Sequence, residues 1–344
     1  GEGDTYFAAV GGISLDGDAA DNKVTLAAGA EIGKKDGVST VTFTSGDLFD
    51  KPGTEVSVTF NNGDLIGGYT QSGSAVNNEV TISGGSVDAN LYGGFVAGNT
   101  GNAASNEVTM NSGKVASVIY GGYVYRDGTG NAEGNKVKIF DGTVGNEKVA
   151  AAVYGGYSKS GKAFNNEVII SSDAVISGAY GGNVYGGYSD TEASGNKVTV
   201  NGGTIDTDVR GGEIWDGTVE NNTITMNGGT VGKDLIGGLA HSGTVAGNTV
   251  ILTGGSVDGS IMGGNSYNAA ITGNTVTLKG GTVKKNVYGG KEDQGNSGAT
   301  NNTVNWYNGE INGSLYGGYS NKGDGFTGNT LNLYAKKSIT TVSG

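Results

Sequence analysis

The chain has 344 residues, of which 69 are glycine, one is proline and none is cysteine, and only 35% are hydrophobic. Its formal net charge of -12 opposes binding to the polyanionic backbone of nucleic acids. The lack of cysteine excludes disulfides and thiolate metal sites. No apolar run reaches the ~18 residues of a membrane span, so we expect no membrane insertion by this segment.

The first 66 residues fit the rest of the chain poorly. Residues 22–26 resemble the start of a repeat, but the Val-Thr-Phe sequence at 41–43 returns at 58–60, after only 17 residues. A solenoid needs an atypical first turn to cover its open strand edge. We therefore expect residues 1–66 to form an irregular N-terminal cap or degenerate coils, and residues 67–344 to form regular β-helix repeats.

From residue 67 onward, an asparagine is followed fifteen residues later by the first glycine of a Gly-Gly pair. The one break in this interval lies between Asn135 and Gly155, where five extra residues intrude. The first glycines of the other pairs are Gly93, Gly121, Gly181, Gly211, Gly237, Gly263, Gly289 and Gly317. The stretch from each pair to the next asparagine varies in length, so we interpret the asparagine-to-glycine arc as scaffold and the remainder as loops. Strict periodicity at 26 to 31 residues is typical of a solenoid.

One repeat, residues 248–273, shows the expected secondary structure. It begins Asn-Thr-Val-Ile-Leu, and apolar residues two apart with β-branched residues between them predict a strand with one buried face. A Gly-Gly turn, a short apolar step and a second apolar segment before the next Gly-Gly pair complete the repeat, and no helical period occurs. Stacked parallel strands connected with the usual right-handed sense predict a right-handed parallel β-helix of about 10–12 turns.

The repeated asparagine is the strongest single-residue signal. Asparagine tolerates the left-handed conformation at tight corners, and its amide can bond the same residue one turn above and below. We therefore expect a buried structural ladder rather than a row of ligand-binding amides. The expected members are Asn78, Asn106, Asn135, Asn166, Asn196, Asn222, Asn248, Asn274, Asn302 and Asn329.

Aromatic residues cluster on both sides of the glycine pair. Tyrosine presents an apolar face with a polar tip, so such a stack could be a carbohydrate- or protein-binding stripe. The alternative, which we favour for most of them, is an aromatic ladder that seals a corner of the coil. An exposed subset is the best candidate contact surface, and the candidates are Tyr123, Tyr157, Tyr188, Trp215 and Tyr319.

One turn departs from the tyrosine pattern. Arg210 and Glu213 flank its Gly-Gly pair, close to Asp206, Asp208 and Trp215. Carboxylates with an arginine and a tryptophan are the ingredients of a polysaccharide site, with paired acids for glycosidic cleavage. A solvated polar patch is the more common origin of such a charge cluster, so catalytic residues are not expected here.

The sequence predicts no metal site and no cofactor. The lone His241 next to Ser242 lacks a positioned acid, so a catalytic triad is not expected. Residues 127–133 and 321–325 carry oxygen donors that could hold Ca²⁺, but they lack the spacing of an EF-hand loop.

The Asn-x-Val-x-Leu, Gly-Gly-x-Val and Val-Tyr-Gly-Gly-Tyr elements from about residue 67 onward resemble the passenger-domain repeats of bacterial autotransporters, the type V secreted surface proteins. The resemblance implies a right-handed β-helix held at the cell surface by a C-terminal outer-membrane barrel, and hence a bacterial cell-surface or extracellular location. The chain contains no barrel-like strands and no protease motif of that family. Because Leu331 and Leu333 are followed by no further Gly-Gly pair, we expect a fragment of a larger protein.

Three functions remain open. The first is a non-enzymatic adhesin or stalk, a monomeric rod that presents variable loops to a host-cell protein or glycan. The second, by fold analogy, is a polysaccharide lyase or glycoside hydrolase that would use the acids between Asp206 and Glu213. The third is a passive structural spacer. The segments that depart most from the repeat, residues 141–152 and 180–187, are the loops to test first.

Overall fold

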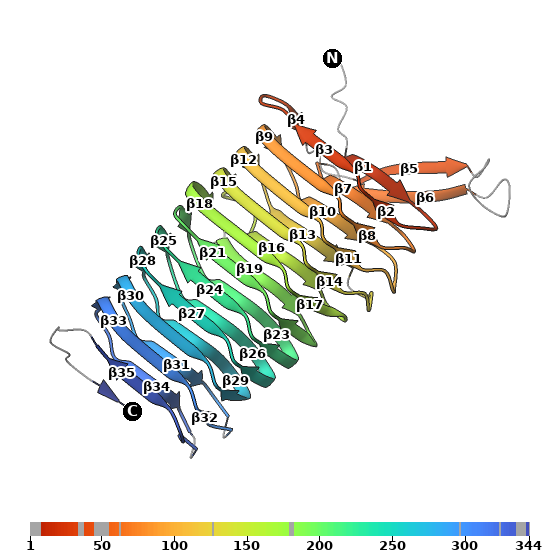
Figure 1. Ribbon diagram of the computed structural model, residues 1–344. Coiled ribbons are helices and arrows are strands. Elements are labelled where there is room, and N and C mark those ends of the chain that lie inside the picture. Colours follow the sequence, from red (N-terminus) through yellow and green to blue (C-terminus); the bar gives the residue numbers. More distant parts are fainter. Residues whose placement is uncertain are drawn as a thin grey trace.

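The computed structural model describes residues 8–33, 38–44, 55–61, 63–125, 127–178, 182–295, 297–322, 325–334 and 342–343. These residues are all-β, and almost all of their strands are parallel and stack along one axis (Figure 1). The protein is therefore a parallel β-helix, a β-solenoid, as the repeat predicts. Because the described part contains no helix, it contains none long and apolar enough to span a membrane.

The strands that begin at the ladder asparagines form one 15-stranded parallel sheet. Each turn adds the strand after the asparagine and the short apolar step that follows, and in six turns the two merge into one strand. The members are β3 (Lys23–Leu26), β4 (Glu31–Ile32), β9 (Glu79–Val87), β12 (Glu107–Val115), β15 (Lys136–Val144), β18 (Glu167–Ile176), β21 (Lys197–Val200), β22 (Thr204–Ile205), β24 (Thr223–Met226), β25 (Thr230–Val231), β27 (Thr249–Leu252), β28 (Ser256–Val257), β30 (Thr275–Val283), β33 (Thr303–Ile311) and β35 (Thr330–Leu333).

The strands around the Gly-Gly pairs and before the asparagines form a second, 19-stranded sheet. Its longer strands are β1 (Ala9–Ser14), β7 (Leu65–Thr70), β10 (Leu91–Val96), β13 (Val118–Val124), β16 (Ala151–Ser158), β19 (Gly182–Ser189), β23 (Val209–Glu220), β26 (Leu235–Ala246), β29 (Ile261–Thr272), β31 (Val287–Glu292) and β34 (Leu315–Ser320). Its short strands are β2 (Ala19–Ala20), β8 (Ala75–Val76), β11 (Ala103–Ala104), β14 (Ala132–Glu133), β17 (Lys162–Phe164), β20 (Glu192–Ser194), β32 (Ala299–Thr300) and β36 (Val342–Ser343).

The N-terminal region is more regular than the sequence predicts. Strand β1 pairs with β7 so that Gly12 lies beside Gly68, and β3 pairs in register with β9. The two Val-Thr-Phe segments do not stack as coils: β5 (Val38–Thr44) and β6 (Glu55–Asn61) form an antiparallel hairpin. In Figure 1 this hairpin projects from the N-terminal end of the coil. Residues 9–32 thus belong to the coil, and the irregular part is one insertion within a turn.

The hairpin also accounts for the number of turns. Nine turns run from a ladder asparagine to a Gly-Gly pair, from the turn of Asn78 to the turn of Asn302. The turn that starts at Asn22 precedes them and contains the hairpin. The nine regular turns alone are slightly fewer than the expected 10–12, because the hairpin makes the first turn irregular.

Alternating side chains fill the interior. In β9, Val80 and Ile82 are completely buried, whereas Thr81 between them faces outward and is partly exposed. The same positions in the other turns form one continuous apolar cluster along the axis. Burial of each such valine, leucine or isoleucine contributes about 1.5–3 kcal/mol, so the core stabilises the coil although each turn offers only a few large side chains.

The asparagines form a continuous column of hydrogen bonds beside this core. In each turn the side-chain Nδ2 donates to Oδ1 of the asparagine in the next turn, for example from Asn196 to Asn222 at 2.9 Å. The same Nδ2 also donates to a backbone carbonyl, and Oδ1 accepts the backbone N–H of the asparagine before it. Each of these buried amides is therefore satisfied only when the neighbouring turns are in register.

The left-handed corner lies one residue before the asparagine, which corrects the expected conformation. Residues with φ of 54 to 56° include Asn77, Ser105 and Asn165, and glycine occupies the same position at Gly195 and Gly247. The ladder asparagines themselves do not have positive φ. They are needed for their amides, and the preceding residue makes the turn.

The Gly-Gly pair is explained by close packing against the asparagine column. A Cβ on Gly94 would lie 2.4 Å from Nδ2 of Asn106, and a Cβ on Gly93 would lie 2.4 Å from the carbonyl oxygen of Gly121. Neither glycine has a positive φ. Glycine is required here because no side chain fits between the strand and the amide ladder.

The doubled motif at 180–187 contains two Gly-Gly pairs, and the structure shows which of them belongs to the turn of Asn166. Gly187 lies beside Gly156, and Gly186 packs on Asn196, so the pair that belongs to this turn is Gly186-Gly187. The fifteen-residue interval from Asn166 to Gly181 is therefore a coincidence of sequence. The true interval is twenty residues, as between Asn135 and Gly155.

Candidate binding surface at the inserted corner

The largest insertions in the coil all lie at one corner, between the short apolar strand and the Gly-Gly strand. In a regular turn this corner consists of residues 88–90. It expands to residues 33–64 in the first turn, to 145–152 after β15, and to 177–183 after β18. The insertions thus lie within the asparagine-to-glycine arc, which was interpreted as scaffold, and they include the two departures at 141–152 and 180–187 that the sequence singles out. By contrast, the length of the arc from the glycine pair to the next asparagine differs between turns by only a few residues.

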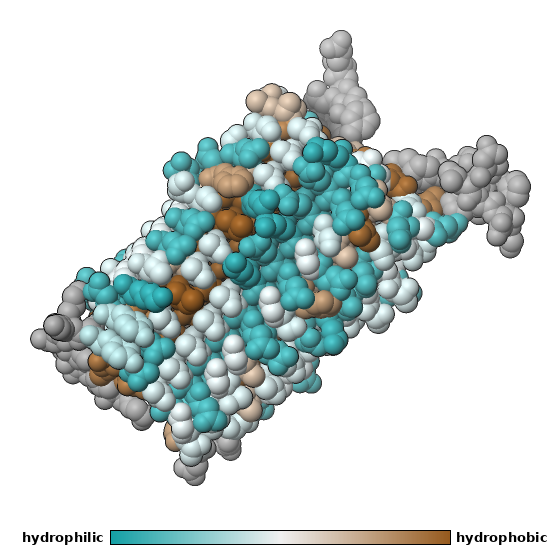
Figure 2. Space-filling view, viewed as in Figure 1, coloured by the Kyte–Doolittle hydropathy of each residue, from teal (hydrophilic) through white to brown (hydrophobic). Residues whose placement is uncertain are grey.

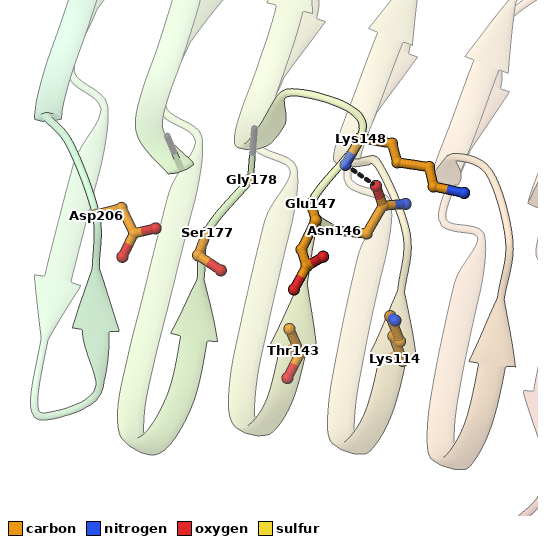
Figure 3. A pocket seen from close by; sticks show the side chains of 9 residues that line it. Lys114, Thr143, Asn146, Glu147, Lys148, Ser177, Gly178 and Asp206 are labelled. Atoms are coloured by element: carbon orange, nitrogen blue, oxygen red, sulfur yellow. Dashed lines mark hydrogen bonds between the residues drawn. The ribbon is translucent and has the colours of Figure 1, made fainter. Parts of the chain in front are cut away.

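Two neighbouring insertions border a surface pocket of about 790 Å³. The inserted loop, defined here as residues 145–150, forms one wall, and the next two turns contribute Ser177 and Asp206. Figure 3 shows Glu147 extending from the inserted loop, with Ser177 and Asp206 on the following turns. Lys114, Thr143 and Lys148 complete the charged and hydroxyl lining. The pocket is thus built at the place where the repeat is interrupted.

The inserted loop is held in one conformation by Asn146. Its Oδ1 accepts the backbone N–H groups of Lys148 and Val149 at 2.8 and 3.1 Å, and its Nδ2 donates to the carbonyl of Ala116 at 3.0 Å. A left-handed residue, Gly145 with φ of 105°, directs the chain into the loop. All donor and acceptor capacity used by Asn146 therefore serves the loop rather than a ligand.

Sequence reasoning groups Asp206, Asp208, Arg210 and Glu213 in one site, but the structure separates them. Asp206 lies on the pocket, whereas Asp208 and Glu213 bind Arg210 on the Gly-Gly strand. The Nη2 atom of Arg210 lies 2.7 Å from Asp208 Oδ2, and Nη1 pairs with Glu213 Oε2. The side chains of Asp208, Arg210 and Glu213 are 14%, 17% and 11% exposed, so this is a nearly buried ion-pair cluster.

The arginine takes the place of a ring in the tyrosine column. Its guanidinium lies 5.3 Å from the centre of the Tyr185 ring. Burial alone would lower the pKa of Arg210, but Glu213, Tyr185 and Asp208 together raise it above its usual value. The guanidinium therefore stays charged and both carboxylates remain its counterions.

Trp215 belongs to an exposed stack that the sequence does not reveal. Its ring stacks on His241 at 4.3 Å between centroids, and His241 stacks on Tyr267 at 4.9 Å. Trp215 is 59% exposed and Tyr267 is 40% exposed. These residues follow the first glycine of their pairs by four positions in three successive turns, which is the pattern that could have found them. The stack therefore leaves two of its three rings widely exposed at its ends.

The tyrosine candidates lie in a ladder along the outer face of the Gly-Gly strands. Tyr157 and Tyr188 stack at 5.0 Å, and Tyr123 and Tyr157 stack at 5.2 Å. Tyr319 packs edge-on against Tyr316 near the other end of the coil. All four candidate tyrosines are half-buried by these contacts. These contacts form the aromatic ladder that the sequence analysis favours for most of the tyrosines. Of the five candidates, only Trp215 is widely exposed.

No broad apolar area appears on the face shown in Figure 2, where hydrophobic residues form small separate patches on a hydrophilic and neutral surface. Among the described residues, no group of three or more His, Cys, Asp or Glu side chains is arranged to hold a metal ion. Asp324 in the second candidate Ca²⁺ segment lies outside the described residues. Comparison with protein-family models, with curated proteins and with solved structures gave no match for this chain.

Proposed function

We propose that this chain is a non-enzymatic binding segment of a bacterial surface protein, an adhesin-like stalk that presents its inserted corner to a host-cell protein or glycan. The observation that carries the proposal is the collection of the insertions at one corner of an otherwise regular coil. Loops on a rigid support are where recognition commonly lies. The parallel β-helix and the resemblance to autotransporter passengers support the same assignment, including a location at the bacterial surface or outside the cell.

The polysaccharide-acting alternative has less support. Its expected acids at Asp208 and Glu213 are counterions of Arg210, so they form no free carboxylate pair on either side of a substrate. A glycosidase needs two such carboxyl groups, one of them able to donate a proton. The passive-spacer alternative is decided by the experiment below.

The test compares the intact chain with a loop-deleted variant on inert beads. Deletion of residues 146–150 would shorten the Asn135–Gly155 interval from twenty residues to the fifteen of a regular turn, so the coil should remain in register. Bead adhesion to a panel of mammalian cells and to protein and glycan arrays should be saturable, and the deletion should reduce it. Asp258→Ala, which removes a partly exposed aspartate that pairs with Lys284 in a turn without insertion, is the control.

Two outcomes would contradict the proposal. If the intact chain adheres to no cell, protein or glycan of the panel, the spacer interpretation replaces it. If adhesion is equal in the intact chain, in the loop deletion and in a deletion of the β5–β6 hairpin, then binding does not use the inserted corner. Retention of fold in each variant is checked by the β-sheet circular dichroism signal and by thermal unfolding.

A further inference from the structure

We infer that the pocket beside the inserted loop binds a neutral oligosaccharide. This inference rests on the binding function proposed above and names the ligand class for one part of the inserted corner. It is carried by the chemistry of the lining, by the availability of its polar groups and by the fixed shape of the loop.

The lining combines hydrogen-bond donors and acceptors in balance. Lys114 and Lys148 are donors, Glu147 and Asp206 are acceptors, and the formal charges of these four side chains sum to zero. The hydroxyl groups of Thr143 and Ser177 can do both. A ligand that matches such a surface carries donors and acceptors on every edge and no net charge. Sugar hydroxyl groups have this property.

These groups are available to a ligand. The charged groups of Lys114, Glu147, Lys148 and Asp206 make no hydrogen bond or ion pair with another described residue, and all four side chains are exposed. Elsewhere on the coil, charges pair across turns: Glu167 lies 2.5 Å from the Nζ of Lys136 and 3.6 Å from that of Lys197. The pocket thus concentrates unpaired charge of both signs where neighbouring turns pair theirs.

Other ligand classes fit less well. The lining contains no large apolar side chain, which disfavours a lipid or an apolar peptide anchor. The net charge of -12 and the balanced pocket disfavour a polyanion such as a sulfated glycan. An extended peptide could add to a free strand edge, but β15 and β18 are paired on both edges by the adjacent turns.

The loop is also prepared for binding before the ligand arrives. Asn146 holds it by three hydrogen bonds, and a Cβ on Gly145 would lie 1.6 Å from the carbonyl oxygen of Ser177, so this corner packs closely against the next turn. A preformed loop loses little conformational entropy when a ligand binds. Weak polar contacts to sugar hydroxyls can then yield measurable affinity.

The test is calorimetric or NMR titration of the purified chain with neutral tri- and tetrasaccharides of glucose, galactose, mannose and N-acetylglucosamine. At least one is expected to bind, and Asp206→Ala and the 146–150 deletion should each weaken that binding at least about tenfold, or 1.4 kcal/mol. Asp258 follows Val257 at the end of β28 as Asp206 follows Ile205 at the end of β22, and β25 lies between these two strands and pairs with both. Asp258→Ala should therefore leave the affinity within about twofold and serve as the matched control.

The inference is overturned if no panel member binds at millimolar concentration, if only anionic sugars bind, or if Asp206→Ala and the deletion leave the affinity unchanged. Its failure can be told from failure of the proposed function. Bead adhesion that depends on residues 146–150 without sugar binding removes only the oligosaccharide. Absence of both removes both, and release of shorter sugars would keep the site but contradict the non-enzymatic function.

Discussion

Two corners of the same coil differ in what they tolerate. At the asparagine corner, every turn from Asn78 to Asn302 places a buried amide in one hydrogen-bonded column. At the inserted corner, the chain needs only residues 88–90 in a regular turn but runs from 33 to 64 in the first one. The first corner repeats because each amide is satisfied only by its neighbours. At the second corner only some neighbouring turns are joined by a side chain, for example where Asp234 Oδ1 accepts the backbone N–H of Ser260 at 2.6 Å, so the chain length there is less constrained.

This difference locates function within a repetitive protein. A change in the buried ladder is strongly destabilising, because each buried amide left without a hydrogen-bond partner lowers the free energy of unfolding by about 1–3 kcal/mol. At the inserted corner the side-chain bonds between turns are interrupted, so extra residues are accepted there at lower cost, because loop-closure entropy grows slowly with length. Recognition can therefore evolve at one corner while the other maintains the coil.

The largest expected effect is at the ladder. Asn196→Ala removes bonds to Asn222 and to the Ala163 carbonyl, and it leaves the backbone N–H of Asn166 without its acceptor. We expect a loss of about 3–5 kcal/mol in the free energy of unfolding, measured by denaturant titration. Asn201→Ala, at an exposed asparagine, should cost less than about 1 kcal/mol. Equal losses in both variants would show that the ladder has no special role.

The second-largest loss of stability is expected at the glycine pair. Gly94→Ala places a methyl group 2.4 Å from the amide of Asn106, so a strand or the ladder must shift. We expect a loss of about 2–3 kcal/mol, read from the same denaturant curves. Gly17 has open space to 3.6 Å around a new Cβ and no positive φ, so Gly17→Ala should change stability by less than about 1 kcal/mol. A tolerated Gly94→Ala would mean that the close approach is not required.

The tyrosine ladder predicts a loss of stability at alkaline pH. Burial raises the pKa of Tyr185 to about 12, and burial also raises the pKa values of Tyr92 and Tyr154. Unfolded tyrosine ionises near pH 10, so this stabilisation is complete below pH 10 and is lost as the pH rises through about 12. For Tyr185 alone the loss is at most about 3 kcal/mol.

Tyrosinate absorbance and far-ultraviolet circular dichroism, recorded over the same titration, check this prediction. Ionisation of the ladder should lag behind that of free tyrosine and coincide with loss of the β-sheet signal. Tyr185→Phe should reduce the dependence on pH. Ionisation of all tyrosines near pH 10 with an intact β signal would contradict it.

The smallest effect is expected at the inserted corner. Deletion of residues 146–150 joins Gly145 to Ala151 and gives this turn the length of the turn from Asn106 to Gly121. The free energy of unfolding should change by less than about 1 kcal/mol, since no ladder residue moves. A loss as large as that of Asn196→Ala would mean that the two corners do not differ in tolerance.

Much of the fold could be predicted from the sequence, and so could part of the candidate site, because the departure from the repeat at 141–152 marks the loop that lines the pocket. Strand positions followed from alternation such as Val80 and Ile82, and the ladder followed from the spacing of the asparagines. The grouping of Asp206 with Glu213 was wrong, because residues close in sequence lie on different sides of a corner. The pairing of Asn166 with Gly181 was also wrong, since two identical motifs compete and only strand pairing selects Gly186.

The sequence by itself determined that this protein is a β-solenoid with a buried asparagine column, because a period of identical residues can be satisfied only by stacking identical turns. Only the tertiary structure decided which corner carries the insertions, which rings are exposed and which acids are already paired. Those properties depend on side chains from different turns that come together in space, such as Trp215 stacked on His241, or Glu147 and Asp206 lining one pocket. Local sequence does not encode such distances.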